Sequence, residues 1–263
     1  ELIEQHADQI ADNFGNEPFN LIELGAGNGK KTNLLINSLI ENNKDFRYIP
    51  VDISKSAITN ISEYMQGSFP DLEIKGMVAD YFDALKWLKK NSKRQNIVLF
   101  LGSSVGNFEP DPLVSFLKTL NNSLNRDDLL FIVFDLKKDI EKLIYAYNDS
   151  SGVTRKFNFN ILERINTELE GAFNFDNFRF YATYNPISGA VESFIVSEIA
   201  HSVEIRALDL TIDFDSYEAI HTESSYKFTA QQIKELAGIT GFGINEMYFD
   251  INKYFTDALW IKS

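Results

Sequence analysis

The chain has 263 residues, no cysteine and a formal net charge of −13. This length can bury the core of one large domain or two small ones, and the absence of cysteine excludes disulfides, thiolate zinc sites and cysteine nucleophiles. The negative charge disfavours a nucleic-acid partner, because phosphates are neutralised by lysine and arginine, so we expect a small-molecule substrate. With three histidines and no cysteine, we expect no metal site. No apolar run reaches membrane-spanning length and no signal-peptide pattern opens the chain, so we expect a cytoplasmic protein without a membrane partner.

An amphipathic helix over residues 1–14 leads into a strand over 19–24, a glycine-rich turn and a second helix. Gly25, Gly27 and Gly29 allow positive φ and let a ligand approach the backbone at the N-terminus of that helix. The alternate spacing differs from the G-x-G-x-x-G loop of dinucleotide-binding proteins, which argues against a nicotinamide cofactor. Taken alone, the turn is also compatible with a strand-to-helix connection that binds nothing.

Acidic residues follow the next two predicted strands. Residues 46–53 form a strand that ends at Asp52, where α/β nucleotide folds bind ribose hydroxyls; the alternative is a helix N-cap, a role that Ser54 could also fill. A helix over 54–66 and a strand over 72–78 follow. Asp80 follows this strand, at a position that resembles the one where many methyltransferases hold the adenine amino group, which makes Tyr81 and Phe82 the possible stacking partners; the alternative is a solvated loop aspartate beside core aromatics.

The strand-and-helix alternation continues to residue 134, with helices over 84–90 and 112–124 and strands over 96–101 and 128–134. The strand over 96–101 is continuously apolar, which indicates burial on both faces. The loop over 102–108 follows it, at the edge where open parallel sheets bind ligands. Five such units predict a doubly wound sheet.

The pattern changes after residue 139. Residues 140 to about 178 read as helices, and residues 178–212 alternate in the manner of an antiparallel sheet. A helix over 229–238 with Thr229 as its N-cap and strands over 242–249 and 258–261 close the chain. We therefore expect a helix-plus-sheet insertion, after which the last two strands return to the parent sheet.

Several motifs occur together and in order. They are Glu23-Leu24-Gly25-Ala26-Gly27 with Lys30-Lys31-Thr32, Pro50-Val51-Asp52-Ile53-Ser54, Phe100-Leu101-Gly102-Ser103 running to Gly106-Asn107-Phe108, Ala146-Tyr147-Asn148-Asp149 with Gly152-Val153-Thr154 and Phe157-Asn158, and Thr222-Glu223-Ser224-Ser225-Tyr226-Lys227-Phe228. The first resembles the opening motif of class I S-adenosylmethionine-dependent methyltransferases. The whole set resembles the histidine-specific Nα-methyltransferases of ergothioneine biosynthesis, over nearly the whole chain.

The resemblance implies an α/β class I methyltransferase fold, a Rossmann-like doubly wound sheet with an inserted α+β substrate-binding domain. The implied boundaries are 1–138 and 228–263 for the domain that binds S-adenosylmethionine and 139–227 for the insertion. The implied activity is trimethylation of the α-amino nitrogen of L-histidine to hercynine. The implied cofactor-binding residues are Glu23, Gly25, Gly27, Lys31, Asp52, Asp80 and Tyr81.

The resemblance also implies the substrate contacts. Asn107 and Tyr147 are expected to hold the amino acid's carboxylate, and Glu223 and Ser225 its imidazole. The alternatives are a core aromatic for Tyr147 and a strand edge with an exposed glutamate for the Glu223 and Ser225 pair. Methyl transfer from a sulfonium needs alignment and exclusion of water rather than a metal, but the amine must first lose its proton.

Two features depart from the family pattern. The chain begins at Glu1, and we expect that an N-terminal segment supplying further tyrosines to the substrate pocket precedes it. At Val191-Glu192-Ser193 the family commonly has methionine after the glutamate, so Ser193 replaces an apolar wall with a small polar one. Three functions stay open: an amino-acid Nα-methyltransferase, a binding or regulatory protein that has kept the cofactor fold without turnover, and, third, a nucleotide-binding oxidoreductase.

Overall fold

The computed structural model describes residues 2–25, 27, 29–149 and 151–263. Ala26 and Asn28 of the glycine motif lie outside these described residues. The chain divides into two compact units: unit 1 comprises Glu1–Leu136 and Phe228–Ser263, and unit 2 comprises Lys137–Lys227. In the described part of the chain no helix is long and apolar enough to cross a membrane.

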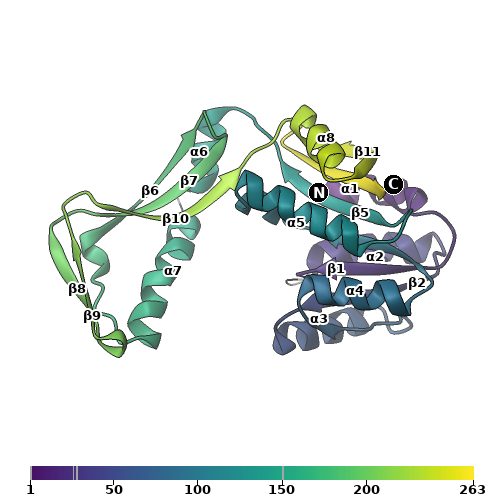
Figure 1. The fold of residues 1–263 in the computed structure, drawn as a ribbon, viewed down its shortest axis with the longest axis horizontal. Helices are drawn as coiled ribbons and strands as arrows, with labels where there is room; N and C mark the ends of the chain where they lie inside the picture. Colours follow the sequence, from purple (N-terminus) through teal and green to yellow (C-terminus); the bar gives the residue numbers. More distant parts are fainter. Residues whose placement is uncertain (1, 26, 28, 150) are drawn as a thin grey trace. The chain divides into compact units, whose positions relative to one another are not determined.

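Unit 1 is built on a seven-stranded sheet with the order β11-β12-β5-β4-β1-β2-β3. Figure 1 labels β1, β2, β5 and β11 of this sheet. The strands are β1 (Phe19–Leu24), β2 (Phe46–Asp52), β3 (Met77–Val78), β4 (Gln95–Phe100), β5 (Leu129–Asp135), β11 (Phe242–Phe249) and β12 (Phe255–Lys262). The first five are parallel, β12 is antiparallel to β5, and β11 is antiparallel to β12. This topology confirms the predicted class I methyltransferase fold, in which the last two strands return to the parent sheet.

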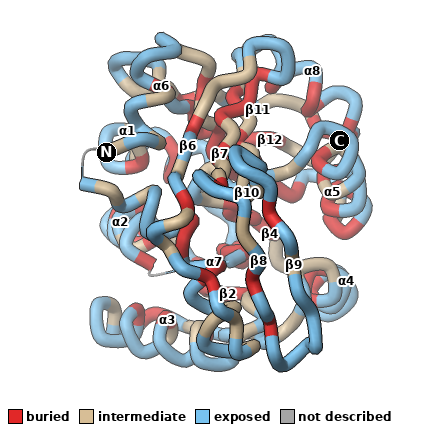
Figure 2. The backbone as a smooth tube through the Cα atoms, turned by 90° about the vertical axis from the view of Figure 1, so that its left-hand side faces the viewer, coloured by how far each residue is buried: buried red, intermediate tan, exposed pale blue. Residues whose placement is uncertain are grey.

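Helices cover both faces of this sheet. The buried residues of α1 (Leu2–Asn13), α2 (Lys30–Glu41) and α3 (Lys55–Ser68) pack with one set of strand side chains. Those of α4 (Tyr81–Asn91), α5 (Pro110–Ser123) and α8 (Ala230–Ile239) pack with the alternate set. Each helix is amphipathic, so its inner stripe is buried and its outer face exposed, as α3 and α5 illustrate in Figure 2.

Two predicted elements around the third strand differ from the observed ones. The strand expected over 72–78 is reduced to Met77–Val78, because upstream only Ile74 bridges Tyr48, and Gly76 packs closely against Ile58 of α3. The helix expected over 84–90 starts at Tyr81. It starts earlier because the Asp80 side chain accepts a hydrogen bond from the Phe82 backbone N–H and caps the helix.

Unit 2 contains two helices, α6 (Ile140–Tyr147) and α7 (Val153–Glu168), and two small antiparallel sheets. One sheet has the order β10-β7-β6, with β6 (Phe178–Asn185), β7 (Ala190–Ser197) and β10 (Ala219–Tyr226). The other pairs β8 (His201–Ile205) with β9 (Leu210–Phe214). Phe159 and Leu162 of α7 pack in one apolar core with Phe178, Ile195 and Val203 from three of the strands.

The chain leaves and re-enters unit 1 at neighbouring points. Leu136, the last residue before unit 2, forms an isolated parallel bridge with Phe228, the first residue after it. The Phe228 backbone N–H donates to the Asp135 carbonyl at the end of β5, and Phe228 packs edge-on against Phe134. Thr229 then caps α8, as predicted, and the structure adds a capping box with Gln232.

Candidate functional site

The three glycines of the turn after β1 all have positive φ, but they have different surroundings. A Cβ on Gly25 would lie 2.7 Å from the Tyr81 hydroxyl, and one on Gly29 would collide with Ile61 of α3. A Cβ on Gly27 would meet nothing within 4 Å. Gly25 and Gly29 are therefore required for packing, whereas Gly27 leaves backbone open to a ligand.

Glu23 lies directly below this turn, in the interior. It is 3% exposed, and its two carboxylate oxygens accept hydrogen bonds from the hydroxyls of Thr32 and Tyr48, at 2.5 Å each. Burial raises the pKa of Glu23 to about 7, although Thr32, Tyr48 and Lys31 oppose the shift. With both oxygens bonded inside the protein, the described geometry gives Glu23 the role of joining β1, α2 and β2 beneath the turn. A direct contact with a cofactor stays a prediction.

Asp52, Asp80 and Tyr81 lie at the carboxyl edge of β2 and β3. The alternative of an N-cap does not apply to Asp52, because Ser54 caps α3; Asp52 instead accepts a hydrogen bond from the Ser54 backbone N–H at 2.8 Å. Asp80 does cap a helix, α4, rather than lying in an unstructured loop. Burial raises the pKa of Tyr81, and the charges of Asp52 and Asp80 raise it further, so the phenol stays protonated near both carboxylates.

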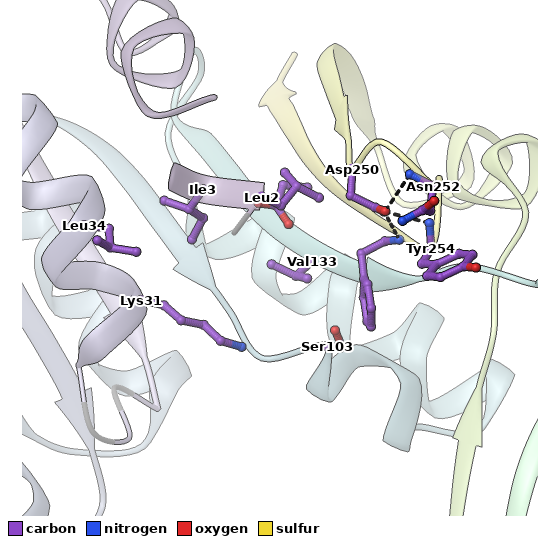
Figure 3. Close-up of a pocket in the computed structure, with 11 residues that line it drawn as sticks. Leu2, Ile3, Lys31, Leu34, Ser103, Val133, Asp250, Asn252 and Tyr254 are labelled. Carbon is purple, nitrogen blue, oxygen red and sulfur yellow. Dashed lines mark hydrogen bonds between the residues drawn. The ribbon is translucent and has the colours of Figure 1, made fainter. Parts of the chain in front are cut away.

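Lys31 and the loop after β4 border a cavity of about 400 Å³ (Figure 3). Lys31 belongs to the first turn of α2, and Ser103 has a φ of 60°, in the left-handed region that favours glycine. Asn107 ends the short 3₁₀ helix η1 (Ser104–Asn107) that follows β4, and its side chain is exposed. The predicted residues of unit 1 thus lie near the carboxyl ends of parallel strands, either in the last residues of a strand or in the turn or first helical residues that follow it.

In unit 2, the predicted residues Tyr147 and Ser225 touch each other. Tyr147 ends α6 and its hydroxyl donates to the Ser225 Oγ at 2.7 Å. Lys227 donates to the hydroxyl oxygens of both residues at 2.8 Å, and its Nζ lies 4.8 Å from the centre of the Tyr147 ring. We refer to Tyr147, Glu223, Ser225 and Lys227 as the β10 cluster. Tyr147 is therefore a member of a polar cluster rather than a simple core aromatic.

Lys227 was not among the predicted site residues, although it is 3% exposed and central to this cluster. The signal was present in the sequence, because Glu223, Ser225 and Lys227 alternate, and alternate residues of a strand share a face. A buried lysine two positions beyond a buried serine indicates a polar site.

The hydrogen bonds of the β10 cluster limit what it can offer a ligand. Ser225 accepts from Tyr147 and Lys227, which uses both lone pairs of its oxygen, so its own O–H remains to be donated. If the bond between the two hydroxyls is reversed, the free proton belongs to Tyr147 instead. Within the described residues, the pair therefore leaves one hydroxyl proton to be donated at a time.

Glu223 is half-buried, and no described residue donates a hydrogen bond to its carboxylate. Burial raises its pKa, and the positive charge of Lys227 opposes that shift. In the sheet Glu223 pairs with Ser193, which is 1% exposed and whose Oγ has no hydrogen-bond partner among the described residues. Paired residues of an antiparallel sheet share a face, so the residue that departs from the family pattern neighbours the predicted specificity residue.

Asn107 belongs to unit 1, whereas the other predicted substrate contacts belong to unit 2. The structure brings Tyr147 and Ser225 together and places Glu223 in the same strand, two residues from Ser225. The joint action of Asn107 with these residues stays a prediction.

Comparison with known proteins gives the same assignment as the motifs. Residues 1–262 match the family described as "Histidine-specific methyltransferase, SAM-dependent". Histidine N-alpha-methyltransferases of Mycobacterium tuberculosis and Mycolicibacterium smegmatis are 35% and 34% identical to this chain over 213 residues, which is 81% of this chain and 66% of each relative. An L-tryptophan methyltransferase of Psilocybe serbica is 26% identical, covering 88% of this chain and 69% of the relative.

Among solved structures, the CMeT domain of a citrinin polyketide synthase superposes with a TM-score of 0.51 at 14% identity, covering 99% of this chain and 52% of that one. That similarity concerns the fold alone. The chain thus spans 66% of the length of its mycobacterial relatives and matches the family over residues 1–262. It belongs to the family of histidine-specific, S-adenosylmethionine-dependent methyltransferases.

Proposed function

We propose that this protein methylates the α-amino nitrogen of an amino acid with S-adenosylmethionine, and that L-histidine, converted to its trimethylated betaine, is the substrate. Unit 1 is proposed to bind the cofactor and unit 2 to bind the amino acid. The observation that carries the substrate assignment is the β10 cluster. Within the described residues, no group donates to the Glu223 carboxylate, and the O–H of Ser225, two residues away, is left to be donated.

The residues of unit 1 fit the proposed cofactor. Gly27 leaves its backbone open, Asp52 and Asp80 each keep acceptor capacity beyond one backbone hydrogen bond, and Lys31 supplies a cation for a carboxylate. When bound, S-adenosylmethionine supplies an electrophilic methyl group. The described residues would bind and orient it, and alignment with exclusion of water is the main contribution that such a transfer needs.

The β10 cluster matches a neutral imidazole. That ring has one N–H donor and one acceptor nitrogen. Glu223 accepts from the donor, and the Ser225 hydroxyl donates to the acceptor. Tyr147 and Lys227 both donate to the Ser225 oxygen, which leaves the Ser225 O–H for the ligand. A substrate with an apolar side chain would leave the half-buried Glu223 carboxylate without a hydrogen-bond partner. The free-energy cost of that unpaired carboxylate is larger than the net contribution of the hydrogen bond.

The test is a mass-spectrometric screen of the common amino acids with the full-length protein and S-adenosylmethionine. We expect three added methyl groups on histidine and none on its imidazole. No mass shift on any amino acid would favour the alternative of a cofactor-binding protein without turnover.

A second candidate is a different amino acid at the same site. The relative named as an L-tryptophan methyltransferase and the small Ser193 opposite Glu223 support this alternative, because a serine leaves more room beside the carboxylate than a methionine. Methylation of tryptophan or another amino acid in preference to histidine, in the same screen, would establish it.

A further inference from the structure

The cavity of about 400 Å³ in unit 1 has mainly apolar walls (Figure 3). They come from α1, α2, β5 and the start of β12, through Leu2, Ile3, Leu34, Val133 and Phe255. A purely apolar cavity would take an apolar ligand. Charged residues also line this one, however, and two of them, Lys31 and Asp257, make it suited to a different class of molecule.

One charged residue of the lining is already used by the protein. Asp250 accepts hydrogen bonds from the backbone N–H groups of Asn252, Tyr254 and Phe255, at 2.6 to 3.0 Å, and so fixes the turn between β11 and β12 (Figure 3). Its carboxylate is therefore part of the turn. Of the described residues in the lining, two further charged ones remain, Lys31 and Asp257.

Asp257 is an unusual residue for its position in β12. It pairs with Val133 of β5 and is 2% exposed, yet its Oδ2 has no hydrogen-bond partner among the described residues. Burial raises the pKa of Asp257 to about 7, against the positive charges of Lys31 and His6. A buried carboxylate oxygen without a donor destabilises the protein, so its position beside a cavity indicates a donor that arrives with a ligand.

Lys31 is the complementary group. Its side chain extends from α2 toward the cavity (Figure 3), and Lys31 and Asp257 form no ion pair with each other among the described residues. Opposite charges that line one cavity without pairing are complementary to a ligand that carries both charges a few bonds apart. An α-amino acid zwitterion is such a ligand, with its ammonium and carboxylate on one carbon.

We propose that Asp257 and Lys31 bind an α-amino acid zwitterion in this cavity, Asp257 accepting from the ammonium and Lys31 donating to the carboxylate. This inference rests on the proposed function, which supplies two molecules with such an end: the cofactor, whose methionine portion is an α-amino acid, and the free amino-acid substrate. Asp257 has no counterpart among the residues expected from the sequence motifs.

Calorimetric titration of the full-length protein can separate the two sources. The ligands are S-adenosylhomocysteine, 5′-methylthioadenosine, which keeps the nucleoside and sulfur but lacks the amino-acid end, and L-histidine. The variants are Asp257→Asn and Lys31→Met, with Glu246→Gln on the exposed face of the neighbouring strand as a matched loss of charge. If the cavity binds the amino-acid end of the cofactor, both test variants weaken the binding of S-adenosylhomocysteine at least tenfold and leave the binding of 5′-methylthioadenosine unchanged.

If the cavity binds the free amino acid instead, both variants weaken the binding of histidine at least tenfold and leave the binding of S-adenosylhomocysteine unchanged. The inference is overturned if folded Asp257→Asn binds all three ligands as Glu246→Gln does. Should Asp257→Asn fail to fold, the exposed Lys31→Met decides by the same criteria. Absence of nucleoside binding to the wild type would instead contradict the proposed function, and the histidine titrations would still decide the inference.

Discussion

Two of the buried carboxylates of unit 1, Glu23 and Asp257, have different surroundings. Glu23, beneath the glycine turn, has a hydroxyl donor for each oxygen. Asp257, in β12, borders a cavity and has an oxygen to which no described residue donates. Burial raises the pKa of both to about 7. A raised pKa therefore does not distinguish a structural carboxylate from one that binds a ligand. The number of donors already supplied by the protein does.

The largest change in stability is expected from a substitution of Asp257. We expect Asp257→Asn to raise the free energy of unfolding at pH 8, because a carboxyl with a pKa of about 7 when folded and 3.8 when unfolded costs on the order of 4 kcal/mol once ionised. Since the folded-state pKa is raised, the advantage of the variant is absent below about pH 4 and grows as pH rises to about 7. Urea unfolding across this range measures it.

Glu246→Gln, an exposed loss of charge on β11, should show no such pH dependence relative to wild type. If the difference in free energy of unfolding between Asp257→Asn and wild type stays constant from pH 4 to pH 8, Asp257 is not a buried, unpaired acid.

A substitution beneath the glycine turn is expected to change the free energy of unfolding in the opposite direction. Tyr48→Phe removes one of the two donors to Glu23 and should lower the free energy of unfolding by about 1.5 to 3 kcal/mol at pH 8, the usual range for a hydrogen bond to a charged group. The loss should shrink at pH 5, where Glu23 is protonated in the folded state. Tyr64→Phe, the same change at an exposed position of α3, should leave stability unaltered.

In unit 2, Glu223 resembles Asp257 because no described residue donates to it. Glu223→Gln should therefore leave folding intact and lower kcat/KM for histidine ~10- to 100-fold, the loss of one charge-assisted hydrogen bond. The control is Glu192→Gln, which alters the neighbouring strand on the opposite face of the sheet. Equal kinetics for the two variants would remove Glu223 from the substrate site.

The smallest effect is expected at Ser193, whose Oγ also has no partner among the described residues. Ser193→Met, which restores the residue common in the family, should raise the preference for histidine over tryptophan by roughly tenfold or less, a range typical of a changed apolar contact. Ser193→Ala separates the loss of the hydroxyl from the gain of volume. Competition assays with both amino acids measure the ratio, and an unchanged ratio would mean that residue 193 does not contact the substrate.

The sequence pattern was sufficient for the parent fold, because long apolar strands and amphipathic helices carry their own periodicity. The strands at residues 19–24 and 242–249 agree with prediction to the residue. The last strand was predicted to begin at residue 258 but begins at Phe255, because Asp257 interrupts the apolar run and resembles a strand end. The length of the third strand was overestimated. An edge strand pairs with only one neighbour, so its length depends on tertiary pairing.

For the site, motifs identified residue types but not their hydrogen bonds. The contact between Tyr147 and Ser225 joins residues 78 positions apart, and no local pattern encodes it. Lys227 and Asp257 were missed for the same reason, since a charged residue is interpreted as exposed until the fold shows what covers it. The structural role of Glu23 likewise depends on Tyr48, 25 residues away.

The bridge between Leu136 and Phe228 has a consequence for engineering. Because both crossings lie side by side at the end of β5, a short turn can rejoin the parent sheet after residues 137–227 are excised, and the same two junctions can receive the corresponding module of another family member. Under the proposed function, in which unit 2 binds the amino acid, such an exchange would transfer the contacts of the β10 cluster and leave the residues of unit 1, Asn107 included, unchanged.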